Sequence, residues 1–252
     1  SVFAIALLTF GLTVEPTASF WDASEYIATS AKLQVGHPPG APFYQMMGAF
    51  FALFANGPEQ IALMINLMSV FSSAFTILFL FWTLTLLLKK LPAFTTLETK
   101  NDAFGFFGSA TIGALAFCFS DSFWFNAVEA EVYAMATCIL SLLFWLSLRW
   151  EQEMNTPRGD RWLLLIAFVI GLSFGVHFMG LLTIPAIGML YYFKNYETVT
   201  FKGFILANVI SVAILLFIFK LLLPLTLALF GKMEVYFVND FNLPFNSGTI
   251  IT

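Results

Sequence analysis

Residues Ile61–Leu88 read IALMINLMSVFSSAFTILFLFWTLTLLL and contain no charged residue and no proline. A helix needs about 20 consecutive apolar residues to cross a hydrocarbon core of about 30 Å, and this stretch exceeds that length. A backbone in lipid must satisfy its own hydrogen bonds, which a helix does within one segment. The stretch therefore predicts a transmembrane helix and places the chain among integral membrane proteins.

The composition of the whole chain supports this class. Of its 252 residues, 60% are hydrophobic, 10% are charged and 32 are Phe, whereas soluble domains carry about 25% charged residues. So few charges cannot cover a water-exposed surface, and a nucleic-acid binder would need a basic field. The composition excludes a soluble enzyme, a disordered chain and a nucleic-acid binder, and it makes the lipid bilayer a partner.

Six further apolar stretches lie on either side of Ile61–Leu88, so we predict an all-α, polytopic transmembrane bundle of about seven spans. The fifth and sixth are short for full crossings and could form a hairpin that enters the membrane only partway. The sequence opens inside an apolar run, so we expect one transmembrane module, 1–252, of a longer protein. Part of the first span and any soluble C-terminal domain would then lie outside this sequence. The predicted spans are Ser1–Val14, Ile61–Leu88, Phe104–Ser120, Val132–Leu148, Trp162–Val176, Phe178–Phe193 and Gly203–Phe230.

The charged residues divide between the two predicted sides of the membrane. One side carries eight of the cations, and by the positive-inside rule this side is cytoplasmic. The other side carries two cations, Lys32 and Lys232, and nine acids, so its acidic groups are where we look for chemistry. The cytoplasmic cations are Lys89, Lys90, Lys100, Arg149, Arg158, Arg161, Lys194 and Lys202, and the outer acids are Glu15, Asp22, Glu25, Glu59, Asp121, Glu129, Glu131, Glu234 and Asp240.

The longest outer segment, Glu15–Gln60, combines a polar part with an apolar run over Phe43–Phe54. A run of that length indicates an interfacial or re-entrant segment. Between Asp22 and Lys32 we expect a short helix, capped by Thr17 or Ser19, on which Asp22 and Glu25 share a face with Thr29. Two carboxylates on one face would raise each other's pKa, which suits a general base at neutral pH.

A rigid turn follows this helix. The sequence Gly36-His37-Pro38-Pro39-Gly40-Ala41-Pro42 has three prolines in five residues, and each proline fixes its own φ. His37 is thereby held at the membrane surface, after the acidic pair.

An acidic pair after the first span, followed by His-Pro-Pro-Gly, resembles the first external loop of the protein O-mannosyltransferases, which have the GT-C fold. Those enzymes have adjacent Asp and Glu, whereas Ala23-Ser24 separates the two acids here. The chain is more similar to a bacterial membrane family, formerly of unknown function and common in Bacteroidetes, that is grouped with the eukaryotic O-mannosyltransferase called transmembrane protein 260. The similar segments are Thr13–Pro42, Asn126–Ala134 and Asp160–Pro185.

The resemblance implies a glycosyltransferase that moves a sugar, mannose by resemblance, from a polyprenyl phosphate to an acceptor hydroxyl of a protein or glycan. It also implies a bacterial inner-membrane protein with its active site outside the cytoplasm. The match assigns the catalytic base to Asp22, with Glu25 as its helper or as the base itself. In the alternative interpretation, Asp22 only caps a helix and Glu25 is solvated.

The leaving phosphate needs cations or hydrogen-bond donors. On the outer side we expect these from Lys32, His37, His177 and Lys232, together with backbone amides of the turn. His177 interrupts two apolar spans, so it is either functional or a packed, hydrogen-bonded residue. Lys220, deep in the seventh span, could reach a lipid phosphate or extend toward the interface.

The short outer loop Asp121–Glu131 supplies a second set of candidates. If it is helical, Asn126, Glu129 and Tyr133 share one face and Glu131 points elsewhere. The resemblance places this loop beside the catalytic pocket, so we expect these residues, Glu131 included, to bind sugar or acceptor, or to orient the base. The alternative is a solvated acidic helix start.

No cofactor is expected beyond the lipid-linked donor, and a divalent cation is possible but not predicted. Two other classes stay open. Intramembrane charge and broken helices would also serve a transporter or ion-coupled carrier, and the chain could be a non-catalytic subunit of a larger membrane complex.

Overall fold

A computed structural model describes residues 2–252, and Ser1, the first residue of the first predicted span, lies outside this range. Within the described part of the chain every regular element is a helix and none is a strand. The chain divides into two compact units that meet at Thr183 and Ile184, and each is described by itself. The predicted all-α class is thereby confirmed, and the single module 1–252 stays a prediction.

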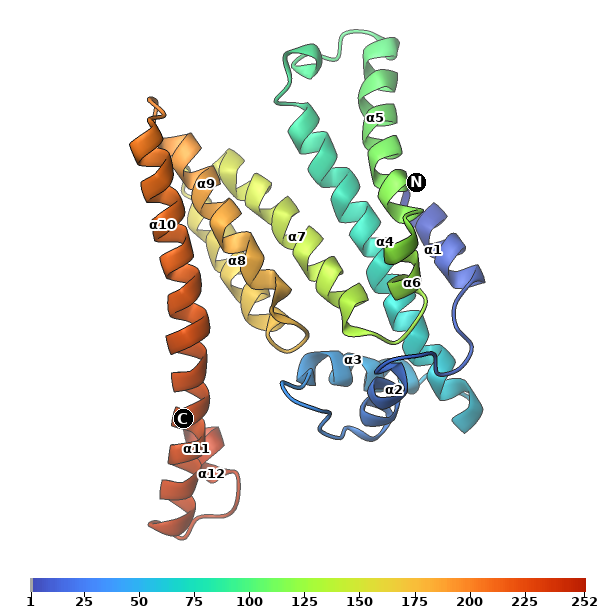
Figure 1. Ribbon diagram of the computed structural model, residues 1–252, viewed down its shortest axis with the longest axis vertical. Coiled ribbons are helices and arrows are strands. Elements are labelled where there is room, and N and C mark those ends of the chain that lie inside the picture. Colours follow the sequence, from blue (N-terminus) through green and yellow to red (C-terminus); the bar gives the residue numbers. More distant parts are fainter. Residues whose placement is uncertain (1) are drawn as a thin grey trace. The chain divides into compact units, whose positions relative to one another are not determined.

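The first unit is a helical bundle built around α4. This helix packs against α1, α5 and α7, and α7 also packs against α8, as Figure 1 shows. The α4 helix has the bounds that its apolar sequence predicts. The bundle helices are α1 (Val2–Leu12), α4 (Ile61–Leu88), α5 (Lys100–Cys118), α7 (Val132–Glu153) and α8 (Gly159–Ser173).

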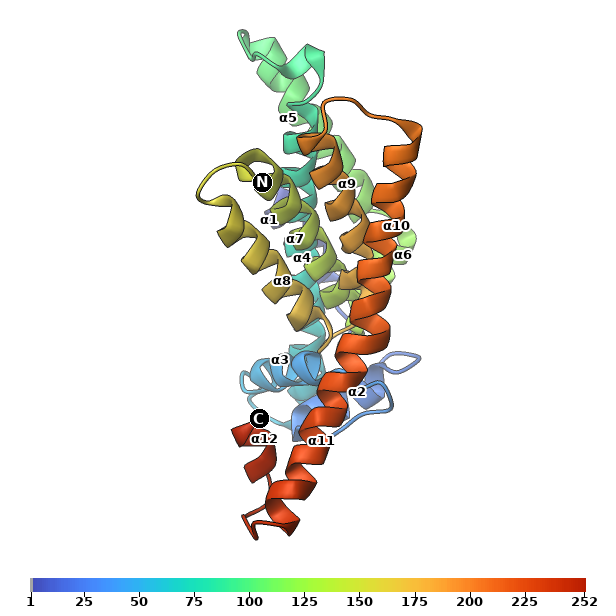
Figure 2. The ribbon, with the colours of Figure 1, turned by 90° about the vertical axis from the view of Figure 1, so that its left-hand side faces the viewer.

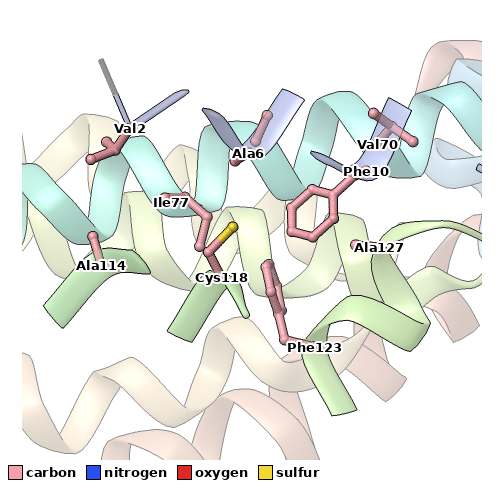
Figure 3. Packing of buried hydrophobic residues seen from close by; sticks show 10 residues of the cluster. Val2, Ala6, Phe10, Val70, Ile77, Ala114, Cys118, Phe123 and Ala127 are labelled. Atoms are coloured by element: carbon pink, nitrogen blue, oxygen red, sulfur yellow. The ribbon is translucent and has the colours of Figure 1, made fainter. Parts of the chain in front are cut away.

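Small side chains let the bundle helices approach closely. Ala6, Ala114 and Ala127 are fully buried in one cluster with larger apolar residues, as Figure 3 shows. Phe10 packs edge-on against Phe123, with 5.8 Å between ring centroids. In a bilayer, helix association depends on this kind of close packing, because lipid is as apolar as the helix surfaces.

Two short helices, α2 (Ala23–Lys32) and α3 (Pro42–Ala52), lie at one end of the bundle. Figure 1 shows them beside the end of α4 at which that helix begins, and both contact α4. The α2 helix lies where the sequence predicts it, and α3 covers most of the apolar run Phe43–Phe54. Proline at the first position of α3 removes one amide that would otherwise lack a partner.

The predicted capping of α2 is wrong. The N-cap residue is Asp22 and makes no side-chain capping hydrogen bond. Thr17 instead donates from its hydroxyl to Glu15 at 3.1 Å, and Ser19 hydrogen-bonds to Glu129. These hydroxyls bind carboxylates outside the helix, so they are not available to the amides of its first turn.

The α5 helix is followed after a bend of 69° by a short helix, α6 (Asp121–Ala127). A capping box begins α5: the Asp102 amide donates to Thr99 Oγ1 at 3.1 Å, and the Thr99 amide donates to Asp102 Oδ2 at 2.9 Å. The chain then turns at residues 128–131 before α7 starts. This turn separates α6 from α7, so residues on its two sides do not share one helical face.

The second unit contains one long helix. It consists of α10 (Phe201–Phe217), a π-helical turn over Ile218–Leu222 that includes Lys220, and α11 (Leu223–Asn239). Figure 2 shows α12 (Ser247–Ile251) folded back beside α11. There the Glu234 carboxylate accepts hydrogen bonds from the amides of Asn246 and Thr249. The unit begins with α9 (Thr183–Asn195), whose first residue belongs to the bundle unit.

Three helices of the described chain are long and apolar enough to cross a membrane, and the bent pair α5–α6 would make a fourth. They are Pro58–Leu88, Val132–Glu153 and Phe201–Asn239. The remaining predicted spans correspond to the shorter helices α1, α8 and α9, of 11, 15 and 13 residues. Every apolar stretch of the sequence therefore contains helix, and the number seven stays a prediction.

Candidate active site

Three connections of the bundle unit meet at the end where α2 and α3 lie. They are residues 13–60, which contain α2 and α3, the turn 128–131 between α6 and α7, and the segment 174–177 after α8. The Asp22 amide donates to Glu131 Oε1 at 3.1 Å, which joins the start of α2 to the start of α7. The amides of Phe43 and Tyr44 donate to the carbonyl of Gly175 at 2.8 and 3.1 Å. The first turn of α3 is thus satisfied by the segment after α8, and all three connections are fixed relative to one another.

A cavity of about 180 Å³ opens between these connections. One part of its wall is polar and consists of Asp22, His37 and Glu131. The other part is mainly aromatic. Its remaining lining residues are Tyr26, Pro39, Gly40, Val132, Tyr133, Phe174, Val176, His177 and Phe178.

The first outer segment brings Asp22, Glu25 and His37 together. The His37 amide donates to Glu25 Oε1 at 2.6 Å, and His37 Nδ1 lies 3.0 Å from Glu25 Oε2. The other ring nitrogen, Nε2, lies 3.9 Å from Asp22 Oδ2. All three side chains are partly exposed, by 56% for Asp22, 38% for Glu25 and 44% for His37.

The expectation that the two acids raise each other's pKa is wrong for Glu25. The hydrogen bonds from the amide and ring of His37 hold the pKa of Glu25 below its usual value. The same carboxylate, by its hydrogen bond and then by its charge, raises the pKa of His37. Hydrogen bonds that favour the charged carboxylate, first from the His37 amide and then from its ring, thus set the direction of the Glu25 pKa.

Glu131 is the acid whose pKa is strongly raised. It is 5% exposed, and burial, followed by the charges of Asp22 and Glu129, raises its pKa to about 7. The sequence named Glu131 as a candidate binding residue but set it off the helical face predicted for Asn126, Glu129 and Tyr133, and that shared face is wrong. Because α6 ends at Ala127 and α7 begins at Val132, no continuous helix connects them and the helical spacing does not apply.

The same break separates the other members of that predicted face. The Asn126 side-chain amide donates from Nδ2 to the Ser122 carbonyl within α6 at 2.9 Å, and Asn126 does not line the cavity. Glu129 is buried and bonds to Ser19, and burial raises its pKa. Only Tyr133 of the three lies in the cavity wall, and Lys32 is exposed at the end of α2, outside that wall.

Tyr133 and His177 form the aromatic wall, with ring centroids 5.5 Å apart. Burial lowers the pKa of His177, so its neutral form is favoured. His177 Nδ1 accepts a hydrogen bond from the Met179 amide at 3.2 Å, so in the neutral ring Nε2 carries the proton. His177 therefore lies in the site as predicted and can donate a hydrogen bond there.

Sequence reasoning missed Tyr26, Phe174 and Phe178. Burial, with the charge of Glu131 as the next cause, raises the pKa of Tyr26 to about 12, so Tyr26 remains a neutral hydrogen-bond donor. Its position one residue after Glu25 was a usable signal. Phe174 and Phe178 flank His177, but 32 Phe in the chain gave no reason to choose these two.

Asp22, Glu25 and His37 each place one oxygen or nitrogen within 4.8 Å of the others, close enough to surround a metal ion. However, His37 Nδ1 and Glu25 Oε2 already contact each other, and a metal bound there would have to displace this contact. We therefore assign none of the three as a metal ligand.

Comparison with known proteins gives one family. Residues 22–200 match the family model described as the protein O-mannosyl-transferase TMEM260 N-terminal domain. The matched range starts at Asp22 and includes every predicted site residue from Asp22 to His177.

Curated proteins similar to the chain include two protein O-mannosyl-transferases. It is 28% identical over 177 residues to the protein O-mannosyl-transferase TMEM260 of Mus musculus, which covers 69% of this chain and 22% of the mouse protein. It is 24% identical over 162 residues to the protein O-mannosyl-transferase tmem260 of Dictyostelium discoideum, covering 64% of this chain and 18% of that protein. The chain thus spans about a fifth of the length of these relatives. No solved structure matches it.

Proposed function

The chain belongs to the family of the protein O-mannosyl-transferase TMEM260 N-terminal domain, and from this we propose that it is a membrane-embedded glycosyltransferase. It transfers one sugar, mannose by family relationship, from a polyprenyl phosphate to a hydroxyl group, that of a protein Ser or Thr. The cavity between the three connections is its active site and faces away from the cytoplasm. We further propose a GT-C-type architecture with seven spans in a bacterial plasma membrane.

One observation carries this proposal. The Asp22 carboxylate lines a cavity that has hydrogen-bonding groups on one side and aromatic rings on the other. No hydrogen bond to either Asp22 carboxylate oxygen is present within residues 2–252, whereas both Glu25 oxygens bind His37. Asp22 is therefore the acid that is free to accept a proton from a substrate.

The size and wall of the cavity suit a single sugar ring. About 180 Å³ equals the liquid volume of about six water molecules, and pockets for drug-sized ligands are about 300 Å³ or larger. Tyr133 and His177 offer ring faces to the apolar side of a sugar, and the Tyr26 hydroxyl and buried Glu131 offer hydrogen bonds to its hydroxyl groups.

The transfer step then runs as follows. The acceptor hydroxyl gives its proton to the Asp22 carboxylate while its oxygen attacks the anomeric carbon of the sugar. A new carbon–oxygen bond forms, and the bond from the anomeric carbon to the phosphate oxygen breaks. The polyprenyl phosphate leaves with that electron pair, so atoms and charge balance without an oxidant or reductant.

A transfer assay tests this function. The purified full-length protein, in lipid nanodiscs with polyprenyl-phosphate mannose and a Ser/Thr peptide, is expected to yield mannosyl peptide by mass spectrometry. Asp22→Asn should lose this transfer. Asp121→Asn is its matched control, since Asp121 is exposed, precedes the turn 128–131 and does not line the cavity. If the wild-type protein transfers no sugar but drives gradient-dependent uptake of a solute into proteoliposomes, the protein is a carrier and not an enzyme.

A further inference from the structure

We propose that His37 binds the phosphate group of the lipid-linked donor, and that Glu25 is the positioning residue that holds His37 for this contact. The inference rests on the proposed function, because it assigns part of the donor to one side of the same cavity. It also separates the two acids of α2: Asp22 acts on the acceptor, and Glu25 acts only through His37.

The hold of Glu25 on His37 involves two contacts. One carboxylate oxygen accepts from the backbone amide of His37 at 2.6 Å, and the other lies 3.0 Å from ring atom Nδ1. Together they fix the position of the residue and the rotation of its ring. In the protonated ring both nitrogens carry a proton; Glu25 accepts the one on Nδ1, so the one on Nε2 is available for another partner.

Nε2 faces the cavity side of the cluster. His37 lines the cavity, whereas Glu25 does not. Nε2 lies 3.9 Å from Asp22 Oδ2, which exceeds hydrogen-bond distance. A ligand oxygen can therefore approach Nε2 without first breaking a hydrogen bond, and it would lie next to the base that receives the acceptor proton.

The charge of the site favours the same assignment. The groups facing His37 are the acids Asp22, Glu25 and Glu131 and the phenol of Tyr26. A donor phosphate would meet repulsion from these acids unless a cation lay among them. His177 is kept neutral by burial, and Lys32 does not line the cavity. Within the described cavity wall, His37 is the residue whose positive charge is favoured, because the hydrogen bond and charge of Glu25 raise its pKa.

The backbone around His37 leaves it little freedom. The Gly40 amide donates to the His37 carbonyl at 2.9 Å, which closes a turn over the two prolines, and Gly40 has φ +79°, a conformation that glycine adopts without cost. On the other side, Gly36 packs against the Glu25 carboxylate, where a Cβ would lie 3.1 Å from Oε1. Loop and helix thus present one geometry to a ligand.

Phosphate binding can be measured without sugar transfer. The probe is methyl dodecyl phosphate, a diester that keeps one negative charge across the pH range used, and its uncharged counterpart is dimethyl dodecyl phosphate. We expect His37→Gln in the full-length protein in nanodiscs to bind the diester about tenfold to a hundredfold more weakly by calorimetry, since a hydrogen bond between charged groups is lost. Binding of the uncharged ester should not change.

The role of Glu25 is tested by pH, in a Glu131→Gln background so that Glu131 does not titrate. With Glu25 present, diester affinity should fall as pH rises through the raised pKa of His37. In Glu25→Gln the fall should come at lower pH, so that affinity returns to the wild-type level at about pH 5.5, where the unassisted imidazole is protonated. Glu59→Gln, the same change at an exposed acid outside the cavity, should behave as the wild type.

Two results would overturn the inference. One is unchanged diester affinity in His37→Gln. The other is an affinity of Glu25→Gln that stays low even at about pH 5.5, which would indicate a purely structural role for Glu25. Neither result depends on sugar transfer, so the proposed function can stand if this inference fails. A wild-type protein that binds the diester but transfers no sugar would instead count against the proposed function alone.

Discussion

At the scale of single residues, the neighbours of each acid decide its protonation. Glu25 and Glu131 are chemically identical, but their pKa values move in opposite directions. Glu25 accepts two hydrogen bonds from His37, which favour its charged form, whereas Glu131 is buried, which favours its neutral form. The site thus contains one ionised glutamate and one that is only partly ionised near pH 7.

Glu131 should make the stability of the protein depend on pH. Its pKa in the folded protein is about 7, above the ordinary value of 4.5. The stabilisation of the folded protein that comes from neutral Glu131 is therefore fully present below about pH 4.5 and is lost as pH rises through about 7. We expect Glu131→Gln, which can still accept from the Asp22 amide, to flatten the fall in unfolding temperature between pH 5 and pH 8 seen by differential scanning fluorimetry in detergent.

The matched control for that change is Glu59→Gln, at an exposed position with no hydrogen bond in the described chain. It should leave the pH dependence of the unfolding temperature as in the wild type. An equal fall with pH in the Glu131→Gln variant would show that the side chain ionises as freely in the folded as in the unfolded protein.

Gly36→Ala should loosen the contact between Glu25 and His37. The added Cβ would lie 3.1 Å from both Glu25 Oε1 and Gln45 Nε2, closer than ordinary contact, so the carboxylate must move. We expect the pKa of His37 to fall toward its usual value. An NMR titration can follow this, because the chain has two histidines.

Gly231→Ala is the control for this titration, since no atom lies within 4 Å of a Cβ at that helical position. Its His37 titration should match the wild type. A Gly36→Ala protein with an unshifted His37 curve would mean that Glu25 does not depend on this close approach.

At the scale of elements, α4 anchors the first outer segment as well as the bundle. The Asn66 side chain is 1% exposed and donates to the carbonyls of Glu15 and Thr17 at 2.6 and 2.9 Å. These bonds hold the chain between α1 and α2 against α4. The position of Asp22 therefore depends on a residue of the central helix that is outside the cavity wall.

Asn66→Ala should destabilise the protein by about 1–3 kcal/mol, because two carbonyls lose their donor in a buried setting. Chemical denaturation in detergent measures the change. Asn101→Ala, at an exposed position at the start of α5, is the control and should change stability little. A free energy of unfolding as high in Asn66→Ala as in Asn101→Ala would contradict the anchoring role.

The elements that sequence could predict are those set by apolar length. Ile61–Leu88 matches α4 residue for residue, because nothing inside that stretch competes with a helix. The turn between α6 and α7 was not predictable, since Asn126-Ala-Val-Glu-Ala-Glu contains neither Gly nor Pro. What holds it in place is tertiary: the Glu15 amide donates to the Val128 carbonyl, and Glu131 binds the start of α2.

For the site, the sequence could identify the candidate residues on α2 and on the rigid turn after it. It could predict their roles only in part. Asp22, Glu25 and His37 are close in sequence, and the turn brings them together. The partner of Glu25 and the inward position of Glu131 depend on contacts between distant segments, for which residue spacing carries no information.

At the scale of the bundle unit, the cavity and a second cluster lie at opposite ends of α4. Trp82, Trp145, Trp162 and Arg149 line a second cavity of about 310 Å³, and the Arg149 guanidinium lies 5.5 Å from the Trp162 ring centroid. From Asn66 to Trp82 a helix rises about 24 Å, close to the thickness of a hydrocarbon core. Tryptophan and arginine are typical of membrane interfaces, so the two ends of the unit suit the two membrane surfaces.

Cysteine labelling tests this orientation. In a Cys118→Ala, Cys138→Ala background, we expect Asp121→Cys to react with a membrane-impermeant maleimide in intact cells. Glu98→Cys, in the loop that precedes α5, should react only after permeabilisation, since its neighbours include the predicted cytoplasmic cations. The reverse pattern would place the cavity on the cytoplasmic side.

The central claim is that Asp22 is the base of a sugar transfer, and its most direct test is the single-turnover transfer rate of Asp22→Asn. With saturating polyprenyl-phosphate mannose and peptide, rapid-quench mass spectrometry should show a rate about 100- to 10,000-fold below wild type, as expected for loss of a general base. Binding of the methyl dodecyl phosphate diester should persist, and Asp121→Asn should transfer at the wild-type rate. A wild-type rate in Asp22→Asn would contradict the account.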